Sequence, residues 1–116
     1  MFISKSIYIA RAGRKGRGVF AKKRFMPGDI LEVSPFVEIP AKGARSLTKT
    51  IINSYWYDLD GKRSALGLGY TSLYNHADEP NAEFAIHSRR RTITIKVIKP
   101  IRKGEEITTN YGYEID

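Results

Sequence analysis

The sequence has no cysteine among its 116 residues and only two histidines, His76 and His87. Without cysteine there can be no disulfide bond and no zinc site with thiolate ligands. Two histidines alone give little basis for a structural metal site, so we predict that no metal is bound.

Long apolar runs are also absent, since the longest ones extend over only a few residues. A membrane-spanning helix needs about 20 consecutive apolar residues, so we expect no membrane span. Residues 1–15 contain no apolar core followed by a small-residue cleavage site, so we expect no secretory signal. These absences favour a soluble protein inside a cell, in the cytoplasm or, if the protein is viral or exported, in a host nucleus.

The charge of the chain is basic and unevenly distributed. Its formal net charge is +8, and lysine and arginine crowd into residues 11–24 and 89–103, whereas acidic residues cluster at 78–83 and 105–116. A solvated basic surface that aids solubility explains the excess, and so does an acidic partner such as nucleic acid. For the second possibility, the run Arg89-Arg90-Arg91 is the candidate for a weak contact with phosphate groups.

Short strands dominate the pattern, because runs of β-branched and aromatic residues alternate with Gly, Pro and Asp turns. The strands are expected at residues 2–9, 18–21, 30–39, 55–59, 82–87, 91–98 and 105–108. The best helical spacing, formed by Leu47, Ile51 and Ile52, lies in residues 44–54, and residues 64–74 favour a short helix or an irregular packed segment. The pattern predicts one mostly β domain of small-barrel or folded-sheet type with little helix.

Three segments carry residue types suited to binding or catalysis, and they are residues 16–21, 75–81 and 104–113. In the first, Gly16 and Gly18 flank Arg17. Glycines allow a backbone turn to come close to a ligand, although a tight hairpin turn is the simpler explanation of the pair.

The second and third segments are richer in polar and aromatic groups. Residues 75–81, with the sequence NHADEPN, offer amide and imidazole groups on a stiff loop, or a turn whose side chains cap their own backbone. Residues 104–113, with the sequence GEEITTNYGY, place Tyr111 and Tyr113 on the same side of an extended chain. This pair forms either a site wall or ordinary core or surface aromatics.

In this order and spacing, the three segments resemble the signature of the SET-domain lysine methyltransferases. The glycine turn is similar to the family's first motif, and Asn75-His76 with Pro80-Asn81 is similar to its Asn-His and Pro-Asn motif. Residues 104–107 with Tyr111-Gly112 are similar to its Gly-Glu-Glu-(Leu/Ile) and Tyr-Gly motif. The agreement of all three motifs in order makes the resemblance more specific than any one of them.

Residues 55–61 and 65–76 are also similar to segments of the family, the second especially to those of small viral and bacterial members. The resemblance covers about residues 14–113, nearly the whole chain. It implies a single SET domain over residues 1–116, with neither a pre-SET module nor a zinc-binding post-SET module. The implied fold is a mostly β, β-clip-like arrangement of short strands and small sheets, in which the C-terminal segment forms a pseudoknot.

The resemblance also implies an activity, the transfer of a methyl group from S-adenosyl-L-methionine to a protein lysine, with S-adenosyl-L-homocysteine as the product. The implied cofactor-binding residues are Gly16, Arg17, Gly18, Asn75, His76 and Tyr111. Of these, Tyr111 is expected to be the catalytic residue, which orients the methyl group and stabilises developing charge. It need not act as a strong base, because the ordinary pKa of a tyrosine is about 10.

The same resemblance assigns Tyr70, Phe84 and Tyr113 to the walls of a channel for the substrate lysine. An apolar channel favours the neutral amine, whose ordinary pKa is about 10.4, and aromatic walls still attract a methylated ammonium. Phe84 stands where the family has a Phe/Tyr switch, and a Phe there weakly favours di- or trimethylation. The other interpretation of Phe84 is a core residue of a strand.

Two positions depart from the family pattern. Ser34 stands near the place where some members have a second active-site tyrosine, and Asn110 stands where an aspartate is frequent. Because no zinc module follows, a second subunit of a homodimer is expected to complete the channel. The acidic clusters at 78–83 and 105–116 would attract a basic protein substrate, such as a histone-like or ribosomal protein.

Two other classes of function are compatible with the sequence. The first is a catalytically inactive SET-like binding module, against which the presence of Tyr111, Asn75 and His76 argues. The second is a small basic β protein that binds nucleic acid, which needs exposed aromatic residues between basic residues. Tyr55 and Tyr57 are the only close aromatic pair of that kind, and no lysine or arginine lies between them.

Overall fold

The computed structural model describes residues 1–40, 56–58, 64–110 and 114–115. Within these residues the chain consists of short strands, and a single 3₁₀ turn, η1 (Gly13–Lys15), is the only helical element. The strands are β1 (Phe2–Ile3), β2 (Ile7–Arg11), β3 (Arg17–Ala21), β4 (Ile30–Ile39), β5 (Trp56–Asp58), β6 (Ser64–Gly67), β7 (Asn75–His76), β8 (Ala82–His87), β9 (Thr92–Val97), β10 (Glu106–Thr109) and β11 (Glu114–Ile115). The mostly β fold with little helix is therefore confirmed.

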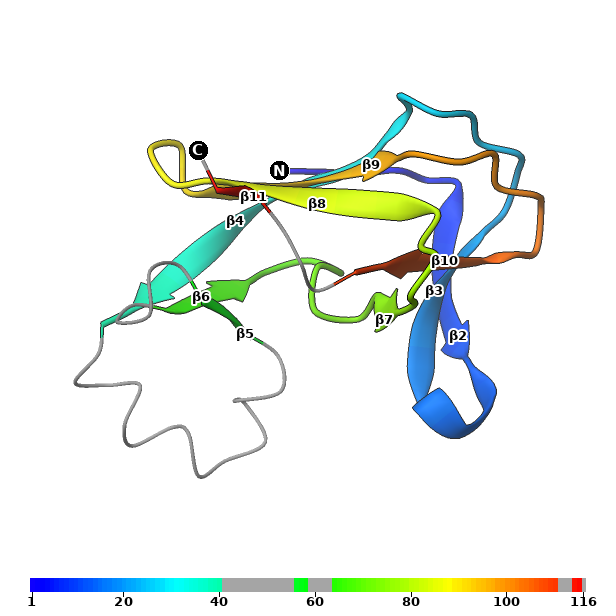
Figure 1. The fold of residues 1–116 in the computed structure, drawn as a ribbon, viewed down its shortest axis with the longest axis horizontal. Helices are drawn as coiled ribbons and strands as arrows, with labels where there is room; N and C mark the ends of the chain where they lie inside the picture. The colour runs from blue at the N-terminus through cyan, green and yellow to red at the C-terminus, as the bar shows by residue number, and fades with distance from the viewer. Residues whose placement is uncertain (41–55, 59–63, 111–113, 116) are drawn as a thin grey trace.

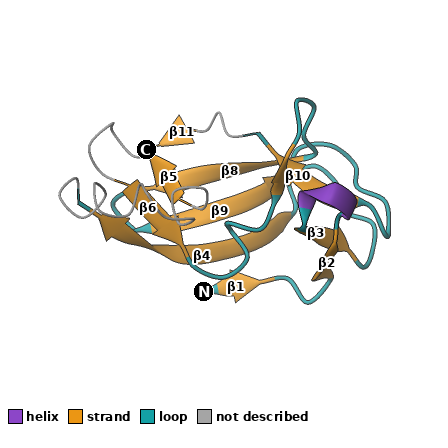
Figure 2. Cartoon of the chain, turned by 90° about the horizontal axis from the view of Figure 1, so that it is seen from below, coloured by secondary structure: helices purple, strands orange, loops and turns teal. Residues whose placement is uncertain are grey.

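The larger sheet is organised around β4, its longest strand. Its order is β11-β8-β9-β4-β6-β5, and β1 also pairs with β4. β4 is antiparallel to β9, β6 and β1, so it holds together strands from the first and second halves of the chain. Figure 2 shows β4, β9 and β8 lying side by side.

Strands β8 and β9 show why this part of the sequence forms a sheet. On β9, Ile93, Ile95 and Val97 are buried, while Thr94 and Lys96 between them are more exposed. Alternation of this kind places every second side chain on the same face, and burial of the apolar face stabilises the sheet. The predicted strands at 82–87 and 91–98 are confirmed.

The smaller sheet has the order β2-β3-β10-β7. β2 and β3 form an antiparallel hairpin, and β10 is antiparallel to β3 but parallel to β7. Figure 1 shows β10 crossing beside β3, with the short strand β7 close by, and the strand order places β10 between them. This sheet therefore brings together three segments that are far apart in the sequence.

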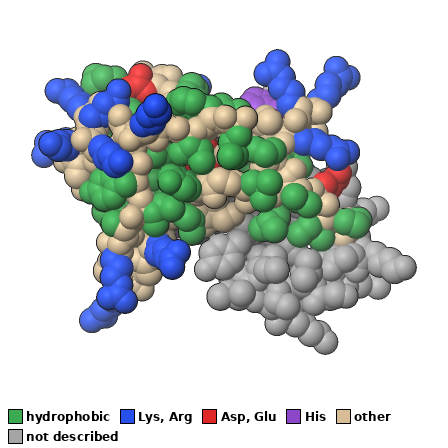
Figure 3. Space-filling view, turned by 180° about the vertical axis from the view of Figure 1, so that it is seen from behind, with side chains coloured by type: hydrophobic (Ala, Val, Ile, Leu, Met, Phe, Trp, Pro, Cys, Tyr) green, Lys and Arg blue, Asp and Glu red, His purple; other side chains and the backbone are tan. Residues whose placement is uncertain are grey.

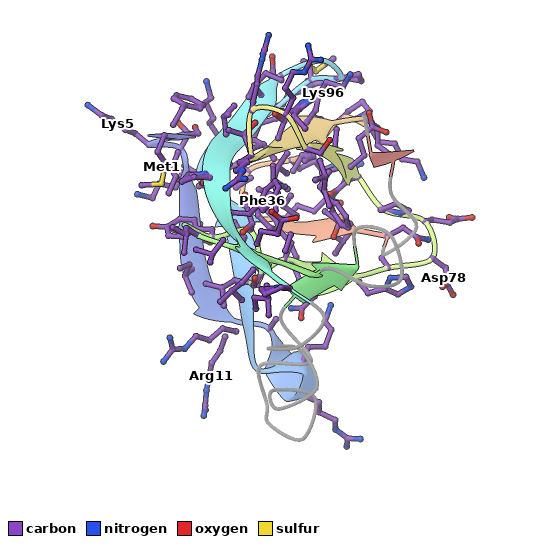
Figure 4. All side chains as sticks on the ribbon, turned by 90° about the vertical axis from the view of Figure 1, so that its left-hand side faces the viewer. Met1, Lys5, Arg11, Phe36, Asp78 and Lys96 are labelled. Carbon is purple, nitrogen blue, oxygen red and sulfur yellow. The ribbon has the colours of Figure 1, made fainter. Side chains whose placement is uncertain are left out.

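A β-bulge in β4 changes which of its residues face the core. The pairing with β9 shifts between Ile30 and Glu32. After the shift Glu32, Ser34 and Phe36 are buried at every second position, and Leu31 before it is buried as well. Figure 4 shows Phe36 pointing toward the interior of the molecule. The bulge thus places a glutamate on the buried face.

Some expectations from the sequence differ from the structure. Residues 2–9 form two strands rather than one, because a turn at 4–6 separates the pairing of β1 with β4 from the pairing of β2 with β3. The helix or irregular segment expected at 64–74 is wrong for its first part, which is strand β6 paired to β4 and β5. The helix expected at 44–54 lies outside the described residues.

The C-terminal segment returns to the larger sheet. β11 pairs in parallel with β8, with Glu114 opposite Ala85 and Ile115 opposite Ile86. Residues 111–113, which connect β10 to β11, lie outside the described residues, so the pseudoknot stays a prediction. Of the helical structure in the described part of the chain, none has the length and apolar character needed to cross a membrane.

Candidate active site

The glycine turn before β3 exposes backbone to solvent. After η1, Gly16 adopts φ 81° and ψ −129°, a conformation that side chains disfavour. The N–H of Ala12 donates to the carbonyl of Gly16 at 2.7 Å and closes the turn. A Cβ built on Gly16 would meet no atom within 4 Å, so open space lies next to this backbone.

Gly18, unlike Gly16, has no free space next to it, because side chains from the two other motifs pack against it. A Cβ at Gly18 would lie 2.5 Å from Oε2 of Glu106 and 2.9 Å from Nδ2 of Asn75. Such distances do not occur between real atoms of this kind, so a side chain here would displace both neighbours. The absence of a side chain at Gly18 lets the three sequence motifs meet.

Asn75 connects these motifs through hydrogen bonds. Its Nδ2 donates to the carbonyl of Arg17 at 3.0 Å and to Oε2 of Glu106 at 2.7 Å. Its backbone lies on β7, in register with Thr108 of β10. Asn75 therefore fixes the distance between the glycine turn and the segment that leads to residue 111.

Glu106 belongs to the third motif, but the resemblance assigned no role to its side chain. In the structure it accepts the amide of Asn75 with one oxygen, and its Oε1 lies 2.6 Å from Nζ of Lys15. The side chain of Glu106 is 16% exposed and that of Lys15 is 50% exposed, so the pair sits at the boundary with solvent. In the sequence, Lys15 next to the glycine turn and Glu106 in the third motif carry opposite charges. They are 91 positions apart, so the sequence alone does not indicate that they form an ion pair.

Asn81 holds the other edge of β10. Its Nδ2 donates to the carbonyl of Glu106 at 2.8 Å, and its Oδ1 accepts from the N–H of Thr108 at 2.9 Å. The residue is buried, with 8% of its surface exposed. The N–H and the C=O of this one side-chain amide thus make the two hydrogen bonds that a neighbouring strand would make with β10. Asn suits the end of the second motif because its side chain carries both a donor and an acceptor.

His76 lies at the outer edge of this assembly. Its Nε2 is 3.4 Å from Oδ1 of Asp78, and its side chain is 37% exposed. Asp78 is fully exposed and points away from the body of the protein (Figure 4). Among the described residues, no group of three His, Cys, Asp or Glu side chains is arranged to hold a metal ion.

The residues expected to line a lysine channel lie in two environments. Tyr70 is partly buried and packs against the hydrophobic core. Phe84 is 4% exposed and shares the buried face of β8 with Ala82 and Ile86. Phe84 therefore lies on the buried face of β8, and its role as a channel wall or as a switch stays a prediction. Tyr111 and Tyr113 lie outside the described residues.

Sequence reasoning missed a buried carboxylate on β4. Glu32 has no exposed surface. Its Oε2 accepts the hydroxyl of Ser34 at 2.6 Å and the N–H of Tyr70 at 2.8 Å, and its Oε1 accepts the hydroxyl of Tyr74 at 2.8 Å. Ser34, which stands near the place of a second active-site tyrosine in some family members, is buried against this carboxylate.

The pKa of Glu32 is raised from the ordinary 4.5, because burial disfavours the charged form. The hydrogen bonds from Ser34, Tyr74 and the Tyr70 backbone lower the pKa and offset part of this rise. No Lys, Arg or His of the described chain forms an ion pair with Glu32. Three neutral donors thus stabilise the carboxylate without an opposite charge.

Gly69 makes this contact with the carboxylate possible. It has φ +66°, and a Cβ there would overlap Oε2 of Glu32 and lie 2.6 Å from Oγ of Ser34. The turn that follows runs directly into Asn75, and the hydroxyl of Thr71 closes it on the carbonyl of Leu68 at 2.8 Å. Glu32 therefore anchors the start of the segment whose end carries the second motif.

Taken together, the described part of the site has exposed backbone and open space at Gly16. One and two residues further on, the polar side chains of Asn75 and Glu106 lie against Arg17 and Gly18. Lys15 adds a cation at its edge. Such a set offers donors, acceptors and charge to a polar ligand that carries both an amine and a carboxylate. The chain reaches residue 111 two positions after β10, which lies next to this set.

Comparisons with known proteins agree with this geometry. The sequence model of the SET domain matches residues 16–112. A Schizosaccharomyces pombe protein named histone-lysine N-methyltransferase, H3 lysine-37 specific, is 29% identical over 111 residues, which is 95% of this chain and 76% of that protein. A crystal structure of a Plasmodium falciparum protein, described as a candidate histone methyltransferase, has a TM-score of 0.73 and 32% identity and covers 95% of this chain and 96% of that one. The similarity extends over nearly the whole chain in sequence and in fold.

Proposed function

Because the chain belongs to the SET-domain family, we propose that it transfers a methyl group from S-adenosyl-L-methionine to the side chain of a lysine in another protein. The observation that carries the proposal is the meeting of Gly18, Asn75 and Glu106, which come from three distant parts of the sequence.

The residues present fit the cofactor. When bound, S-adenosyl-L-methionine would supply a methyl group on a positively charged sulfur, which a neutral amine can accept while the thioether S-adenosyl-L-homocysteine leaves. The open backbone at Gly16 would accept the ligand closely, and Lys15 and Arg17 would face its carboxylate. Asn75 and His76 would hold its remaining polar groups, while the Asn75 amide keeps the carbonyl of Arg17 in place.

Tyr111 is the proposed catalytic residue. It stands two positions after Thr109, the last residue of β10, and β10 pairs with Asn75 and His76. This short separation in sequence supports the assignment. Its hydroxyl would orient the methyl group and stabilise developing charge. The protein would contribute mainly by positioning, because alignment of the reacting groups recovers up to about 7–11 kcal/mol of the barrier.

Tyr70, Phe84 and Tyr113 are the proposed channel walls. β11 pairs beside Ala85, the neighbour of Phe84, so the chain that follows Tyr113 returns to the strand that carries Phe84. An aromatic channel would favour a neutral lysine and still tolerate its methylated forms. A Phe rather than a Tyr at position 84 supports di- or trimethylation.

Partners are proposed from the charge of the chain and from the family to which it belongs. A basic, histone-like substrate suits Glu79 and Glu83, both exposed near the second motif. A second copy of the chain would complete the channel in a homodimer. The weak contact of residues 89–91 with nucleic acid stays a prediction, and Arg91 there lies 3.8 Å from Glu38, which neutralises part of the charge. A catalytically inactive binding module is the alternative function.

The test is methyl incorporation. Radiolabelled S-adenosyl-L-methionine, a peptide array with basic lysine-bearing peptides, and the purified chain should give labelled peptides. Tyr111→Phe should lower the rate by about a hundredfold or more, by loss of a positioned hydroxyl. Cofactor binding without any incorporation, in wild type and on all peptides, would favour the inactive module instead.

A further inference from the structure

Two connections meet at one end of the molecule, away from the glycine turn. They are residues 22–29, between β3 and β4, and residues 98–105, between β9 and β10. Phe25 and Ile101 exchange two backbone hydrogen bonds of 2.9 Å, and the N–H of Gly104 donates to the carbonyl of Ala21 at 2.8 Å. The two connections therefore form one joined surface rather than two separate loops.

This surface, here called the basic end, carries six cations. They are Lys22, Lys23, Arg24, Lys99, Arg102 and Lys103, and all six are exposed. Only two acidic residues, Asp29 and Glu105, lie in the same connections. The basic end therefore carries a net charge of +4, which is half of the net charge of +8 of the whole chain.

The two acidic side chains are directed to the backbone of their own turns. Oδ2 of Asp29 accepts the N–H of Met26 at 2.9 Å, and Oε1 of Glu105 accepts the N–H of Arg102 at 2.9 Å. No ion pair joins any of the six cations to a carboxylate among the described residues. Like charges that are held together without counter-charges repel each other, and an anionic partner would relieve the repulsion.

We propose that the basic end binds the phosphate backbone of a nucleic acid. Figure 3 shows lysine and arginine side chains gathered at the end of the molecule where these connections lie. Six exposed cations on a rigid, hydrogen-bonded support can each contact a phosphate and release a counterion. The proposal does not depend on methyl transfer, although a nucleic acid contact would hold the enzyme near basic proteins that bind the same strand.

Nucleic acid fits this surface better than a lipid membrane does. Membrane-surface segments combine cations with an amphipathic helix that inserts Trp, Phe or Leu. In these connections the aromatic residue, Phe25, is 3% exposed, and the large apolar residues that reach solvent are Met26 at 46% and Ile98 at 37%. The two connections therefore contain neither an amphipathic helix nor an exposed aromatic residue that would insert into a membrane.

The experiment measures binding of a short fluorescein-labelled DNA duplex by anisotropy at several salt concentrations. The test variant is K22Q/K23Q/R24Q, and the matched control is R89Q/R90Q/R91Q, which removes the same charge at the β8–β9 turn. We expect the test variant to bind about tenfold more weakly at low salt, and its salt slope should fall by about 0.9 for each phosphate that it no longer neutralises. Because the contact proposed for residues 89–91 is weak and Glu38 lies near Arg91, the control should change affinity by less than a third as much.

A second test variant, K99Q/R102Q/K103Q, removes the other three cations of the basic end. If circular dichroism shows that the first test variant does not fold, the second one takes its place, with the same expected loss of affinity. Three results would overturn the proposal. They are an absence of DNA binding by wild type, an equal loss in test and control variants, and binding to vesicles of phosphatidylserine without binding to DNA. Methyl transfer on a free peptide serves as an independent readout, because the test variants should leave it unchanged.

Discussion

The segment from Gly69 to His76 is attached to the rest of the protein at both ends, and the two attachments differ in burial. At its start, the N–H of Tyr70 binds the fully buried carboxylate of Glu32. At its end, the amide of Asn75 binds Glu106, whose partner Lys15 is half exposed. Groups in contact with solvent can exchange partners with water, whereas buried ones cannot. The first attachment should therefore determine stability and the second should determine binding.

The largest effect is expected for Gly69→Ala. The new Cβ would be forced against Glu32 in a backbone conformation that side chains disfavour, at a cost of about 3 kcal/mol or more. Gly104→Ala is the matched control, because Gly104 has φ +86° but nothing within 4 Å of its added Cβ. It should cost only the backbone strain, about 1–2 kcal/mol. Urea denaturation measures the free energy of unfolding of both variants. Equal losses would show that the contact of residue 69 with Glu32 adds nothing to the backbone strain.

Glu32→Gln should change how stability depends on pH. The folded-state pKa lies above 4.5, so the contribution of Glu32 is fully present below pH 4.5 and is lost as the pH rises through the raised pKa. Gln resembles the protonated form, since its oxygen can accept from Ser34 and Tyr70 while its amide faces the Tyr74 hydroxyl.

The stability of Glu32→Gln relative to wild type should therefore increase as the pH rises from 4.5, and then level off. Urea denaturation across this pH range measures the difference, in which the other titrating groups largely cancel. A difference that stays constant with pH would show that burial does not shift the ionisation of Glu32.

A smaller loss of stability is expected for Gly18→Ala, with a larger loss of function. The added Cβ would push against the ends of the Glu106 and Asn75 side chains, which can move toward solvent, so unfolding should become easier by only about 1 kcal/mol. Displacement of Asn75 should weaken binding of S-adenosyl-L-homocysteine by about tenfold or more, equivalent to about 1.4 kcal/mol. Calorimetry and urea denaturation on the same preparation separate the two effects. A loss of stability without a loss of affinity would contradict the division of roles.

The smallest effect on stability is expected for Lys15→Ala. The ion pair with Glu106 is 2.6 Å long, but Lys15 is half exposed, and exposed pairs contribute little. The free energy of unfolding should change by less than about 0.5 kcal/mol, and less still at high salt. A loss as large as that of Gly69→Ala would show that the solvent-facing attachment also determines stability.

The sequence predicted the strands well where one face alone is buried. The alternation of Ile93, Ile95 and Val97 identified β9, and the three motifs identified the family, because both signals lie within short windows. The order of the motifs also indicated that residues 16–18 and Asn75 belong to one site.

Glu32 could not be predicted in the same way. It stands in a strand pattern where a charged residue normally faces solvent, and its burial depends on a bulge and on Tyr70 and Tyr74, which are 38 and 42 positions away. Strand β6 was missed for a related reason, since Ser64 to Gly67 forms a strand through pairing with β4 and β5 rather than through its own residues. In both cases the structure depends on residues that are far away in the sequence.

The most direct measurement is a calorimetric titration of S-adenosyl-L-homocysteine into wild type, Asn75→Ala and the control Lys96→Ala, whose ion pair with Glu83 lies on the other sheet. If the glycine turn, Asn75 and β10 form one cofactor site, wild type and Lys96→Ala should bind alike. Asn75→Ala should then bind at least about tenfold more weakly. Equal affinity of Asn75→Ala and wild type, or no binding by wild type, would contradict the assignment of this site.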